Sequence, residues 1–326
     1  MKPNIAIVSG GDSGEYEISL KSAEVVKKHL DDTLFNVYLI VIHKGHWCYD
    51  DDHGIRHAVS REDFSLPLSA GKVNFDAVFI AIHGTPGEDG KIQGYFDLVG
   101  IPYTSCDQAT SAITFNKYFC NNYVKSFGLK VAKSLVIHKG EAAGEVEILE
   151  HLKLPVFVKP NKGGSSVGAS KVKAIDGLKP AIDLAFHEDD QVMVEEFMPG
   201  REISSGVVKI NGALKALPLT EIISKNEFFD YEAKYQGKSE EITPAPVDEE
   251  IRKIIQETSL KFYQILNCKG IVRFDYILNG RELFFLEVNT VPGFSEASII
   301  PQQAMKAGIT LKELFTGAVI NAINDR

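Results

Sequence analysis

The chain has 326 residues, of which 44% are hydrophobic and 24% are charged, as in ordinary folded globular proteins. The length predicts two or three domains, and the composition excludes disordered, collagen-like and disulfide-scaffold proteins. The net charge of −9 offers no broad basic surface, and apolar runs such as Val37 to Ile42 are far shorter than the roughly 18 residues of a membrane span, so we expect neither nucleic acid nor a membrane as partner.

The start of the chain leads directly into the strand-like run Ile5 to Val8. It lacks the apolar stretch and cleavage pattern of a secretory signal, which favours a cytoplasmic protein. The four cysteines are widely scattered and match neither a zinc-ligand spacing nor a dense disulfide framework. We expect them to be reduced, structural thiols.

Short apolar strands alternate with helical patterns in the first hundred residues. A helix is expected through Leu20 to Leu30, and strands are expected over Ile5 to Ser9, Phe35 to Ile42, Ala77 to Ile82 and Ile101 to Thr104. Near-continuous apolar strands between amphipathic helices are typical of a parallel α/β sheet, whose ligands bind beyond the carboxyl ends of the strands. We assign residues 1–106 to this N-terminal α/β domain.

The pattern changes after Thr104, and we divide the rest into a central domain, 107–194, and a C-terminal domain, 195–326. Helices are expected over Ser111 to Ser126 and from Asp248 onward. Strands are expected over Ala132 to His138, Val156 to Lys159, Gln191 to Glu196 and Glu202 to Lys209. The polar segment near 221–246 lacks periodicity and exceeds the usual loop length, which predicts an active-site lid.

Two neighbouring strands carry a candidate metal site. Asp275 lies in the first, and Glu287 and Asn289 lie in the second, where residues two apart share a face. Oxygen ligands of this kind suit Mg²⁺ bound together with substrate phosphates. The alternative is that these are exposed residues of an amphipathic hairpin.

The register of this hairpin depends on its turn, for which Asn279-Gly280 is a strong signal. A two-residue Asn-Gly loop would leave Asp275 on the opposite face from Glu287. We therefore predict a three-residue connection ending at Arg281, with a left-handed glycine and a bulge. This register places Arg273 roughly across from Glu287.

A second candidate site begins at Lys159, which ends an apolar strand and precedes the glycine- and serine-rich segment 161–168. A lysine followed by a loop that presents backbone N–H groups suits a polyphosphate. The segment matches neither the Walker A nor the dinucleotide-binding pattern. A simple linker is the alternative.

A third cluster, Gly10 to Ser19, follows the first strand. Its glycines allow a ligand close to the backbone, and Glu15 is suited to pair with an ammonium group. The alternative is that Glu15 and Glu17 only supply negative charge to the start of the following helix.

Taken in order, six motifs resemble those of D-alanine–D-alanine ligases across nearly the whole chain. They are Gly10-Gly11 with Glu15 to Leu20, His83-Gly84 with Gly87 to Gly90, Lys159-Pro160 with Gly164 to Gly168, Asp230 to Tyr235, Arg273 to Asp275, and Glu287 to Gly293. The resemblance implies an α/β protein in which the N-terminal parallel-sheet domain is followed by a two-part ATP-grasp fold. It also implies a homodimer.

The activity implied is ATP-driven formation of D-alanyl-D-alanine for peptidoglycan, through an acyl phosphate, with two Mg²⁺ ions, which Mn²⁺ could replace. The implied metal ligands are Asp275, Glu287 and Asn289. The implied ATP-binding residues are Lys117, Lys159, Ser166, Glu195, Glu196, Phe197, Met198, Glu202 and Lys234.

The implied catalytic residues begin with Glu15, which anchors the ammonium of the first D-alanine and links through Ser165 to Tyr235 on the lid. Arg273 and the Gly293 N–H resemble a pair that stabilises the oxyanion of the tetrahedral intermediate. The implied substrate-binding residues are His83, Ser298 and Ile299.

The sequence departs from the family pattern in three places. Glu196 replaces a common lysine, Val291 replaces a common serine, and the loop Asn161 to Gly164 lacks the serine, arginine and glutamate that often precede its last glycine. Three alternatives also stay open. They are a ligase that makes D-alanyl-D-lactate or D-alanyl-D-serine, another ATP-grasp ligase that joins a carboxylate to an amine, and a non-catalytic ATP-binding module.

Overall fold

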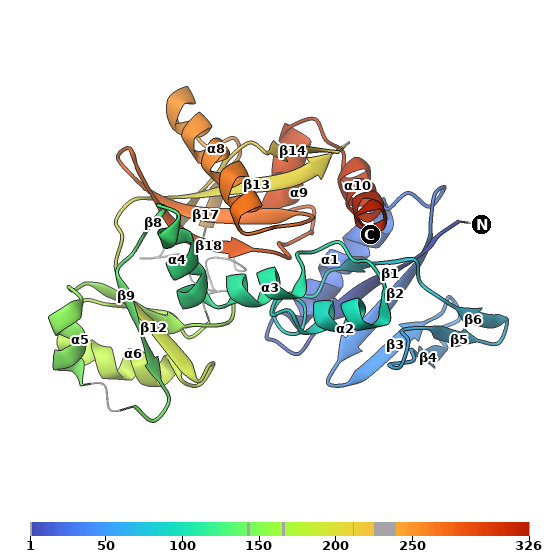
Figure 1. Ribbon diagram of the computed structural model, residues 1–326, viewed down its shortest axis with the longest axis horizontal. Helices are drawn as coiled ribbons and strands as arrows, with labels where there is room; N and C mark the ends of the chain where they lie inside the picture. The colour runs from blue at the N-terminus through green and yellow to red at the C-terminus, as the bar shows by residue number, and fades with distance from the viewer. Residues whose placement is uncertain (1, 142–143, 165–166, 211, 225–238, 326) are drawn as a thin grey trace.

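The computed structural model describes residues 2–141, 144–164, 167–210, 212–224 and 239–325. The three larger sheets of the described residues run along the chain, from the N-terminal part through the central part to the C-terminal part (Figure 1). The buried hydrophobic residues form three clusters, and the first of them also includes residues of the C-terminal part. The mixed α/β class that the sequence predicts is confirmed.

The N-terminal sheet has the strand order β4-β3-β2-β1-β7. Its parallel part agrees with the prediction and consists of β1 (Asn4–Gly10), β2 (Asn36–His43) and β7 (Ala77–Ile80). The antiparallel strands β3 (His46–Asp50) and β4 (Arg56–Ala58) extend it, and a small separate sheet contains β5 (Leu66–Leu68) and β6 (Gly71–Val73).

The antiparallel extension has a local cause between β2 and β3. His43 pairs with His46, and the two residues between them, Lys44 and Gly45, both have positive φ, at 46° and 78°. Positive φ at both central residues is the geometry of a tight hairpin turn. The strand expected at Ile101 to Thr104 is wrong, because this segment makes only an isolated parallel bridge, from Tyr103 to Val78.

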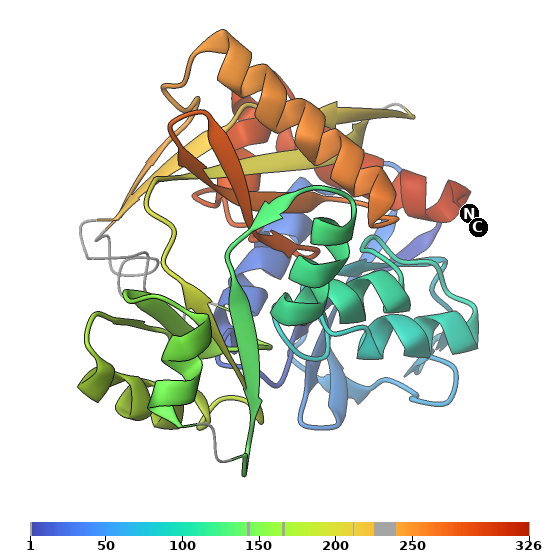
Figure 2. The same ribbon diagram turned by 60° about the vertical axis from the view of Figure 1, so that its left-hand side comes forward.

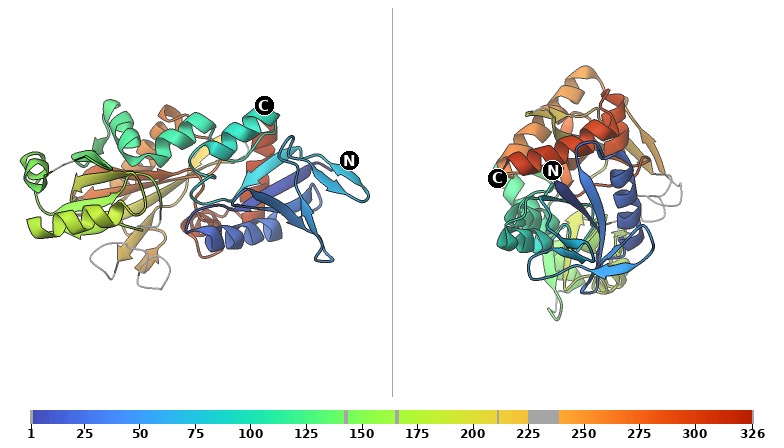
Figure 3. Two further views of the ribbon diagram at one scale, coloured as in Figure 1. Left: turned by 90° about the horizontal axis from the view of Figure 1, so that it is seen from below. Right: turned by 90° about the vertical axis from the view of Figure 1, so that its right-hand side faces the viewer.

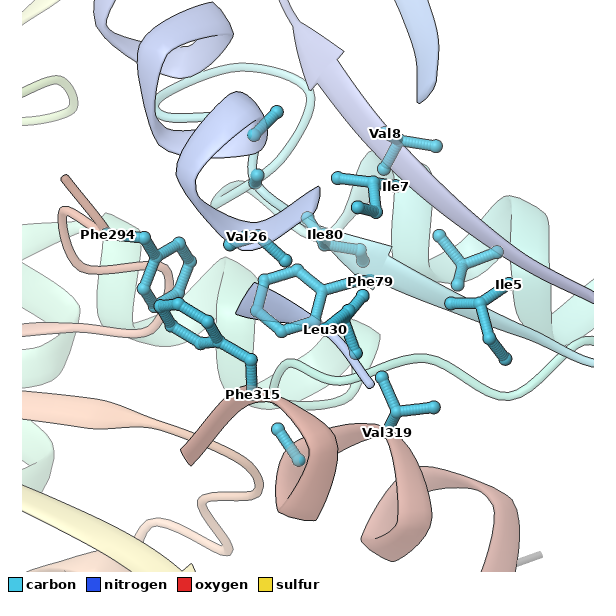
Figure 4. Packing of buried hydrophobic residues seen from close by; sticks show 14 of the residues in the cluster. Ile5, Ile7, Val8, Val26, Leu30, Phe79, Ile80, Phe294, Phe315 and Val319 are labelled. Carbon is cyan, nitrogen blue, oxygen red and sulfur yellow. The ribbon is translucent and has the colours of Figure 1, made fainter. Parts of the chain in front are cut away.

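Helices α1 (Tyr16–His29) and α2 (Lys91–Val99) lie on opposite faces of the N-terminal sheet (Figure 3). The C-terminal helix α10 (Leu311–Asn324) also packs on this sheet, and Phe315 and Val319 join its core beside Phe79 (Figure 4). The last helix of the chain therefore ties the C-terminal part to the first sheet.

The helix expected over Ser111 to Ser126 is two helices, α3 (Gln108–Phe115) and α4 (Lys117–Ser126). Asn116 separates them because its backbone is extended and its side chain accepts a hydrogen bond from the Phe119 N–H, which caps α4. Both helices contact β18 of the C-terminal sheet, and α4 also contacts β9 of the central sheet (Figure 2).

The central sheet is antiparallel, in the order β11-β10-β12-β9, and its buried face packs on two helices. The strands are β9 (Ser134–His138), β10 (Val156–Pro160), β11 (Ser170–Val172) and β12 (Gln191–Glu196). The helices are α5 (Glu145–His151) and α6 (Leu178–Ala185), preceded by the short η1 (Ile175–Gly177).

The C-terminal sheet has the order β16-β15-β13-β17-β18-β8, with β14 paired to β13. Its strands are β8 (Lys130–Val131), β13 (Arg201–Ile210), β14 (Ala213–Ala216), β15 (Thr220–Ser224), β16 (Ser239–Ile242), β17 (Val272–Asn279) and β18 (Glu282–Asn289). Its helices include α8 (Glu249–Ile265) and α9 (Ile299–Lys306). Asp248 caps α8 by accepting the Ile251 N–H at 2.8 Å, as the acidic start of that helix predicts.

The segment expected to be one long loop, near 221–246, begins and ends in sheet. β15 and β16 pair antiparallel, with Ile222 opposite Glu241. The polar composition concealed these strands, of which β16 lies at the edge of the sheet and β15 lies next to it. Residues 225–238, where the lid is predicted, lie outside the described part of the chain.

The predicted register of the β17–β18 hairpin is wrong. Asn279 pairs with Glu282, so the connection is a two-residue turn formed by Gly280 and Arg281. Gly280 has a φ of +60° and is left-handed, as predicted. The bulge lies inside the ladder at Leu286 instead of in the turn, because Phe285 pairs with Tyr276 while Glu287 pairs with Asp275.

The bulge sets which side chains face each other. Asp275 lies opposite Glu287 and Arg273 lies opposite Asn289, so the two carboxylates are cross-strand partners. Within the described residues, no helix is both long and apolar enough to cross a membrane.

Candidate active site

Glu15 is the N-cap residue of α1 and directly precedes its first residue, Tyr16. Its carboxylate makes no capping hydrogen bond to that helix, and it lies against the backbone of two glycines. A Cβ at Gly164 would lie 2.9 Å from Glu15 Oε2, and a Cβ at Gly84 would lie 3.4 Å from the same atom. The glycines therefore leave a carboxylate between the end of β7 and the glycine-rich loop.

His83 follows β7 and is buried. Its Nδ1 lies 2.9 Å from the Val291 carbonyl oxygen, and its Nε2 lies 2.9 Å from Ser22 Oγ. Burial lowers the pKa of His83, although the charge of nearby Glu15 opposes this change. His83 is therefore a neutral imidazole at neutral pH, hydrogen-bonded on both sides.

Glu88 is a buried carboxyl group in the same loop, and it accepts the Gly84 N–H at 2.8 Å. Burial and then the charge of Glu15 raise its pKa to about 8, against the opposing backbone hydrogen bonds from Gly84 and Val291. Glu88 thus shares with His83 a contact to the backbone of Val291.

Arg273 and Asp275 form a buried ion pair on β17. The guanidinium Nη2 lies 2.8 Å from Asp275 Oδ2, and its Nε donates to both carboxylate oxygens. Burial opposes the charge of Arg273, but the charge and hydrogen bonds of Asp275, together with Glu287 and Glu241, raise its pKa. The arginine stays charged and is held at the predicted metal site.

Asp275 receives two further hydrogen bonds. Ser204 Oγ on β13 donates to Oδ1 at 2.5 Å, and Asn289 Nδ2 donates to Oδ2 at 3.0 Å. Ser204 and Asp275 are cross-strand partners. All three predicted metal-ligating residues therefore lie on one hairpin, and two of them are in direct contact.

Lys117, the first residue of α4, connects this hairpin with the glycine-rich loop. Its Nζ donates to the Gly163 carbonyl oxygen at 2.7 Å and lies 3.5 Å from Glu287 Oε2. A predicted phosphate-binding lysine thus neutralises a predicted metal ligand, which brings the two predicted sites together.

Lys159, at the end of β10, forms a buried ion pair with Glu195 on β12, with Nζ 2.5 Å from Oε1. The next three predicted nucleotide contacts follow directly after Glu195. Glu196 accepts the Lys153 N–H at 3.2 Å, and the Lys171 ammonium lies 3.6 Å from the centroid of the Phe197 ring.

Met198 is half-buried in the connection from β12 to β13. Glu202 lies on β13, opposite Ile222 and Ile277 of the neighbouring strands. The residues predicted to read the nucleoside therefore follow the chain from the central sheet to the C-terminal sheet.

Gly293 and Ser298 lie next to each other after β18. A Cβ at Gly293 would lie 2.7 Å from Ser298 Oγ, so the glycine lets the Ser298 side chain approach this backbone closely. Ser298 is the N-cap residue of α9, and its hydroxyl contacts Ser295 Oγ at 2.7 Å. Ile299 has a buried side chain, so it would offer a ligand its backbone N–H at the helix N-terminus.

Four predicted site residues lie outside the described part of the chain. They are Ser165 and Ser166 in the glycine-rich loop, and Lys234 and Tyr235 in the predicted lid. Their roles remain predictions.

Sequence reasoning missed several residues that contact the site. Glu241 on β16 is near enough for the charges of Arg273 and Asp275 to act on it, and burial raises its pKa. Ser22 and Ser204 contact His83 and Asp275. A lone serine carries no distinctive pattern, whereas Glu88 belongs to a motif that was noted without a role for that residue.

The fit of this hairpin to a metal ion rests on its oxygen donors. Among the described residues, no group of three or more His, Cys, Asp or Glu side chains could hold a metal by itself. Asp275 and Glu287 with the amide of Asn289 form a smaller set, to which substrate phosphates would add oxygens. Such a set fits Mg²⁺.

A cavity of about 710 Å³ lies elsewhere, between the end of α2, the turn after α8 and α10. None of the described residues that line it belongs to the predicted site. Two of its charged lining residues, Lys209 and Asp325, form an ion pair with each other. The cavity is therefore separate from the hairpin that carries the predicted metal ligands.

Two family models match the chain: "D-ala D-ala ligase N-terminus" over residues 4–106 and "D-ala D-ala ligase C-terminus" over residues 123–320. The D-alanine–D-alanine ligase of Flavobacterium johnsoniae is 48% identical over 97% of this chain and 98% of its own length. The D-alanine–D-alanine ligase of Parabacteroides distasonis is 44% identical over 100% of this chain and 99% of its own length.

Solved structures show the same similarity. The VanG D-Ala:D-Ser ligase from Enterococcus faecalis has a TM-score of 0.87 and 33% identity, over 99% of this chain and 100% of that one. The D-alanyl-alanine synthetase A from Vibrio cholerae has a TM-score of 0.87 and 28% identity, over 99% of both chains.

Proposed function

The chain belongs to the D-alanine–D-alanine ligase family, and we propose that it joins two D-alanine molecules in an ATP-driven reaction to make D-alanyl-D-alanine for peptidoglycan precursors. The position of Glu15 carries this proposal. Its carboxylate lies against both Gly84 and Gly164, so an ammonium bound there would have its own carboxylate near the loop suited to phosphates.

In the first step, a carboxylate oxygen of the first D-alanine attacks the γ-phosphorus of ATP, ADP leaves, and an acyl phosphate forms. Glu15 would hold the ammonium, while Lys117 and Lys159 would contact phosphate oxygens. Both lysines are paired with carboxylates, Glu287 and Glu195. Nucleotide binding would let them exchange one anionic partner for another.

The charged hairpin fits a magnesium-dependent form of this chemistry. When bound, Mg²⁺ would supply positive charge that offsets the crowding of carboxylate and phosphate oxygens. Asp275, Glu287 and Asn289 would hold it, and the family resemblance implies two ions.

In the second step, the amine of the second D-alanine attacks the acyl carbonyl, loses a proton, and displaces phosphate. Arg273 and the Gly293 N–H would stabilise the oxyanion of the tetrahedral intermediate. Ser298 and the backbone of Ile299, at the N-terminus of α9, would bind the carboxylate of the second D-alanine. Ser165 and Tyr235 would keep the role that the resemblance implies for them, as the link from Glu15 to the lid.

The nucleoside part of ATP would lie along the segment 195–202, where the chain passes from β12 to β13. Phe197 already stacks with a cation, Lys171, and offers an apolar face to a base. Met198, Glu196 and Glu202 would complete the contacts with the base and ribose.

The experiment is phosphate release from ATP and Mg²⁺ by the purified protein, with product identification by mass. D-Alanine should give phosphate and dipeptide in equal amounts, and L-alanine should give neither. Phosphate release only with a different acid and amine would contradict D-alanine as the substrate but would still support an ATP-grasp ligase. No release with any pair would favour a non-catalytic ATP-binding module.

A second candidate, D-alanyl-D-serine synthesis, is favoured by the similarity to the VanG ligase. The relatives at 44% to 48% identity are D-alanine–D-alanine ligases, which is why we prefer the dipeptide. Coupling of D-alanine to D-serine or D-lactate as fast as to D-alanine, at neutral pH, would reverse this preference.

We also propose a homodimer located in the cytoplasm, where ATP and the precursors of the cell wall are made. Light scattering on the purified protein should give a mass near twice the 35.9 kDa of the chain. A mass of one chain at micromolar concentration would contradict the dimer.

A further inference from the structure

The segment 291–294, Val291-Pro292-Gly293-Phe294, follows the charged hairpin and carries the Gly293 N–H that we propose as an oxyanion donor. It lies against the N-terminal domain, more than 200 residues earlier in the chain. A backbone donor acts on a developing oxyanion only if its N–H is held in a fixed direction. The contacts that hold this segment therefore bear on the chemistry.

Three hydrogen bonds join the two ends of the segment through Ser22 and His83. Val291 O lies 2.9 Å from His83 Nδ1, His83 Nε2 lies 2.9 Å from Ser22 Oγ, and the Phe294 N–H donates to Ser22 Oγ at 3.3 Å. Together with the chain from Val291 to Phe294, these bonds close a ring.

The chemistry of the groups fixes the direction of each bond. A carbonyl oxygen only accepts, so His83 Nδ1 carries the hydrogen that binds Val291 O. In a neutral imidazole Nε2 then accepts, so the Ser22 hydroxyl donates to it and its oxygen accepts the Phe294 N–H. Ser22 thus supplies both roles that the ring requires.

Packing and burial leave this ring little freedom. Ser22 is 0% exposed on α1. The Phe294 ring packs edge-on against Phe79 and Phe315, at centroid distances of 5.3 and 5.8 Å (Figure 4). The ring of hydrogen bonds and the aromatic contacts fix the ends of the segment, and the proline ring restricts its middle.

We propose that Ser22 is a positioning residue for the reaction, which aims the Gly293 N–H at the tetrahedral intermediate by holding His83 and Phe294. This inference rests on the proposed function. Without the hydroxyl, the Phe294 N–H and His83 Nε2 lose their partner, and the segment can rotate away from the direction that the oxyanion needs.

The consequence should be confined to the second chemical step. If the acyl phosphate forms normally but the amine attacks it slowly, the acyl phosphate has time to leave the site and to be hydrolysed in solution, where the Gly293 N–H plays no part. Hydrolysis returns D-alanine and releases phosphate without dipeptide. The ratio of phosphate to dipeptide therefore reports on the oxyanion donor, whereas a smaller folded fraction would lower both products equally.

The test compares Ser22→Ala with Ser259→Ala in the proposed assay. Ser259 is a matched control, because it is also 0% exposed and hydrogen-bonded, to Ile255 O and Tyr276 Oη, but it does not contact the segment 291–294. Loss of a whole oxyanion donor lowers kcat by roughly 10²- to 10³-fold, so a misaimed donor should lower dipeptide formation by about tenfold. The KM for ATP should stay within about twofold.

We expect a phosphate-to-dipeptide ratio near one for the wild type and Ser259→Ala, and above about two for Ser22→Ala. A ratio near one in Ser22→Ala, or equal ratios in both variants, would overturn the inference and leave the proposed function intact. A wild type that makes no dipeptide would refute the proposed function and this inference with it.

If Ser22→Ala does not fold, a measurement on the wild-type protein tests the ring of hydrogen bonds instead. Nitrogen NMR of histidine-labelled protein, with His83→Gln used to identify the signal, should show His83 with Nδ1 protonated and Nε2 as an acceptor at neutral pH. Protonation of Nε2 in place of Nδ1 would break the ring and overturn the proposal.

Discussion

The two ends of the candidate site hold their side chains by different means. On the β17–β18 hairpin, opposite charges satisfy each other, with Arg273 on Asp275 and Lys117 beside Glu287. In the loop after β7, neutral hydrogen bonds hold His83 between Ser22 and Val291.

This difference shows what each region can do when substrates bind. A charged group can exchange a carboxylate for a phosphate and remain neutralised, so the hairpin can rearrange around a nucleotide. A neutral buried hydrogen bond gains nothing from such an exchange and loses a partner if it opens. We expect the hairpin to adapt and the ring around Ser22 to stay fixed.

The largest effect on activity should come from removing charge on the β17–β18 hairpin. Asp275→Asn combined with Glu287→Gln should lower dipeptide formation at least about a thousandfold, because metal stabilisation of several kcal/mol is lost. Glu282→Gln is the control, since this exposed residue lies on the same hairpin and pairs with Lys130. If the double variant is fully active and its activity does not depend on Mg²⁺, these residues are not metal ligands.

Glu15 lies between the two regions, and its charge affects both His83 and Glu88. Glu15→Gln should raise the KM for the first D-alanine about 10- to 100-fold, through the loss of a charge-assisted hydrogen bond of roughly 1.5–3 kcal/mol. Nucleotide affinity, measured by calorimetry, should not change.

The matched control for Glu15→Gln is Glu17→Gln. Glu17 is an exposed acidic residue in the first turn of the same helix. Equal kinetics in the two variants would mean that Glu15 only supplies charge to the start of α1.

The buried groups in the loop after β7 should make the stability of the protein depend on pH. The pKa of Glu88 is raised to about 8, so the folded protein holds this proton more tightly than the unfolded chain does. Its stabilising contribution is complete below about pH 4.5 and is lost as the pH rises through 8. The free energy of unfolding should fall by roughly 1–2 kcal/mol between pH 6 and 7.5.

Urea unfolding at several pH values checks this prediction, with Glu88→Gln as the comparison. The variant should lack the decline. His83 acts with the opposite sign, because its lowered pKa removes stability as the pH falls below about 6.5. A decline of the same size in Glu88→Gln would assign it to another group.

The smallest effect should come from a buried hydrogen bond that serves neither region. Ser259→Ala removes the contact with Tyr276 Oη and should lower the free energy of unfolding by about 1 kcal/mol, with unchanged kinetics. Thermal unfolding together with the coupling assay measures both quantities. Altered kinetics would mean that the contact between α8 and β17 affects the geometry of the hairpin.

Sequence patterns located several elements well, since those elements have local causes. The apolar runs at β1 and β2 and the cap at Asp248 depend on neighbours in the chain. Patterns failed where a single residue changed the local geometry. Asn116 divides one expected helix into two, and Lys44-Gly45 turns the sheet antiparallel.

The sequence by itself determined which chemical groups are present. The strand alternation of Glu287 and Asn289 is a local property of the backbone, and so is the left-handed Gly280. The motifs that keep their order along the chain likewise indicate the ligase family.

Only the tertiary structure decided which of these groups meet. The bulge at Leu286 puts Asp275 opposite Glu287, and His83 reaches Val291 across 208 positions of sequence. Such contacts depend on the register of a sheet and on the docking of one domain against another. No local pattern encodes them, because their energy comes from burying partners that are distant in the chain.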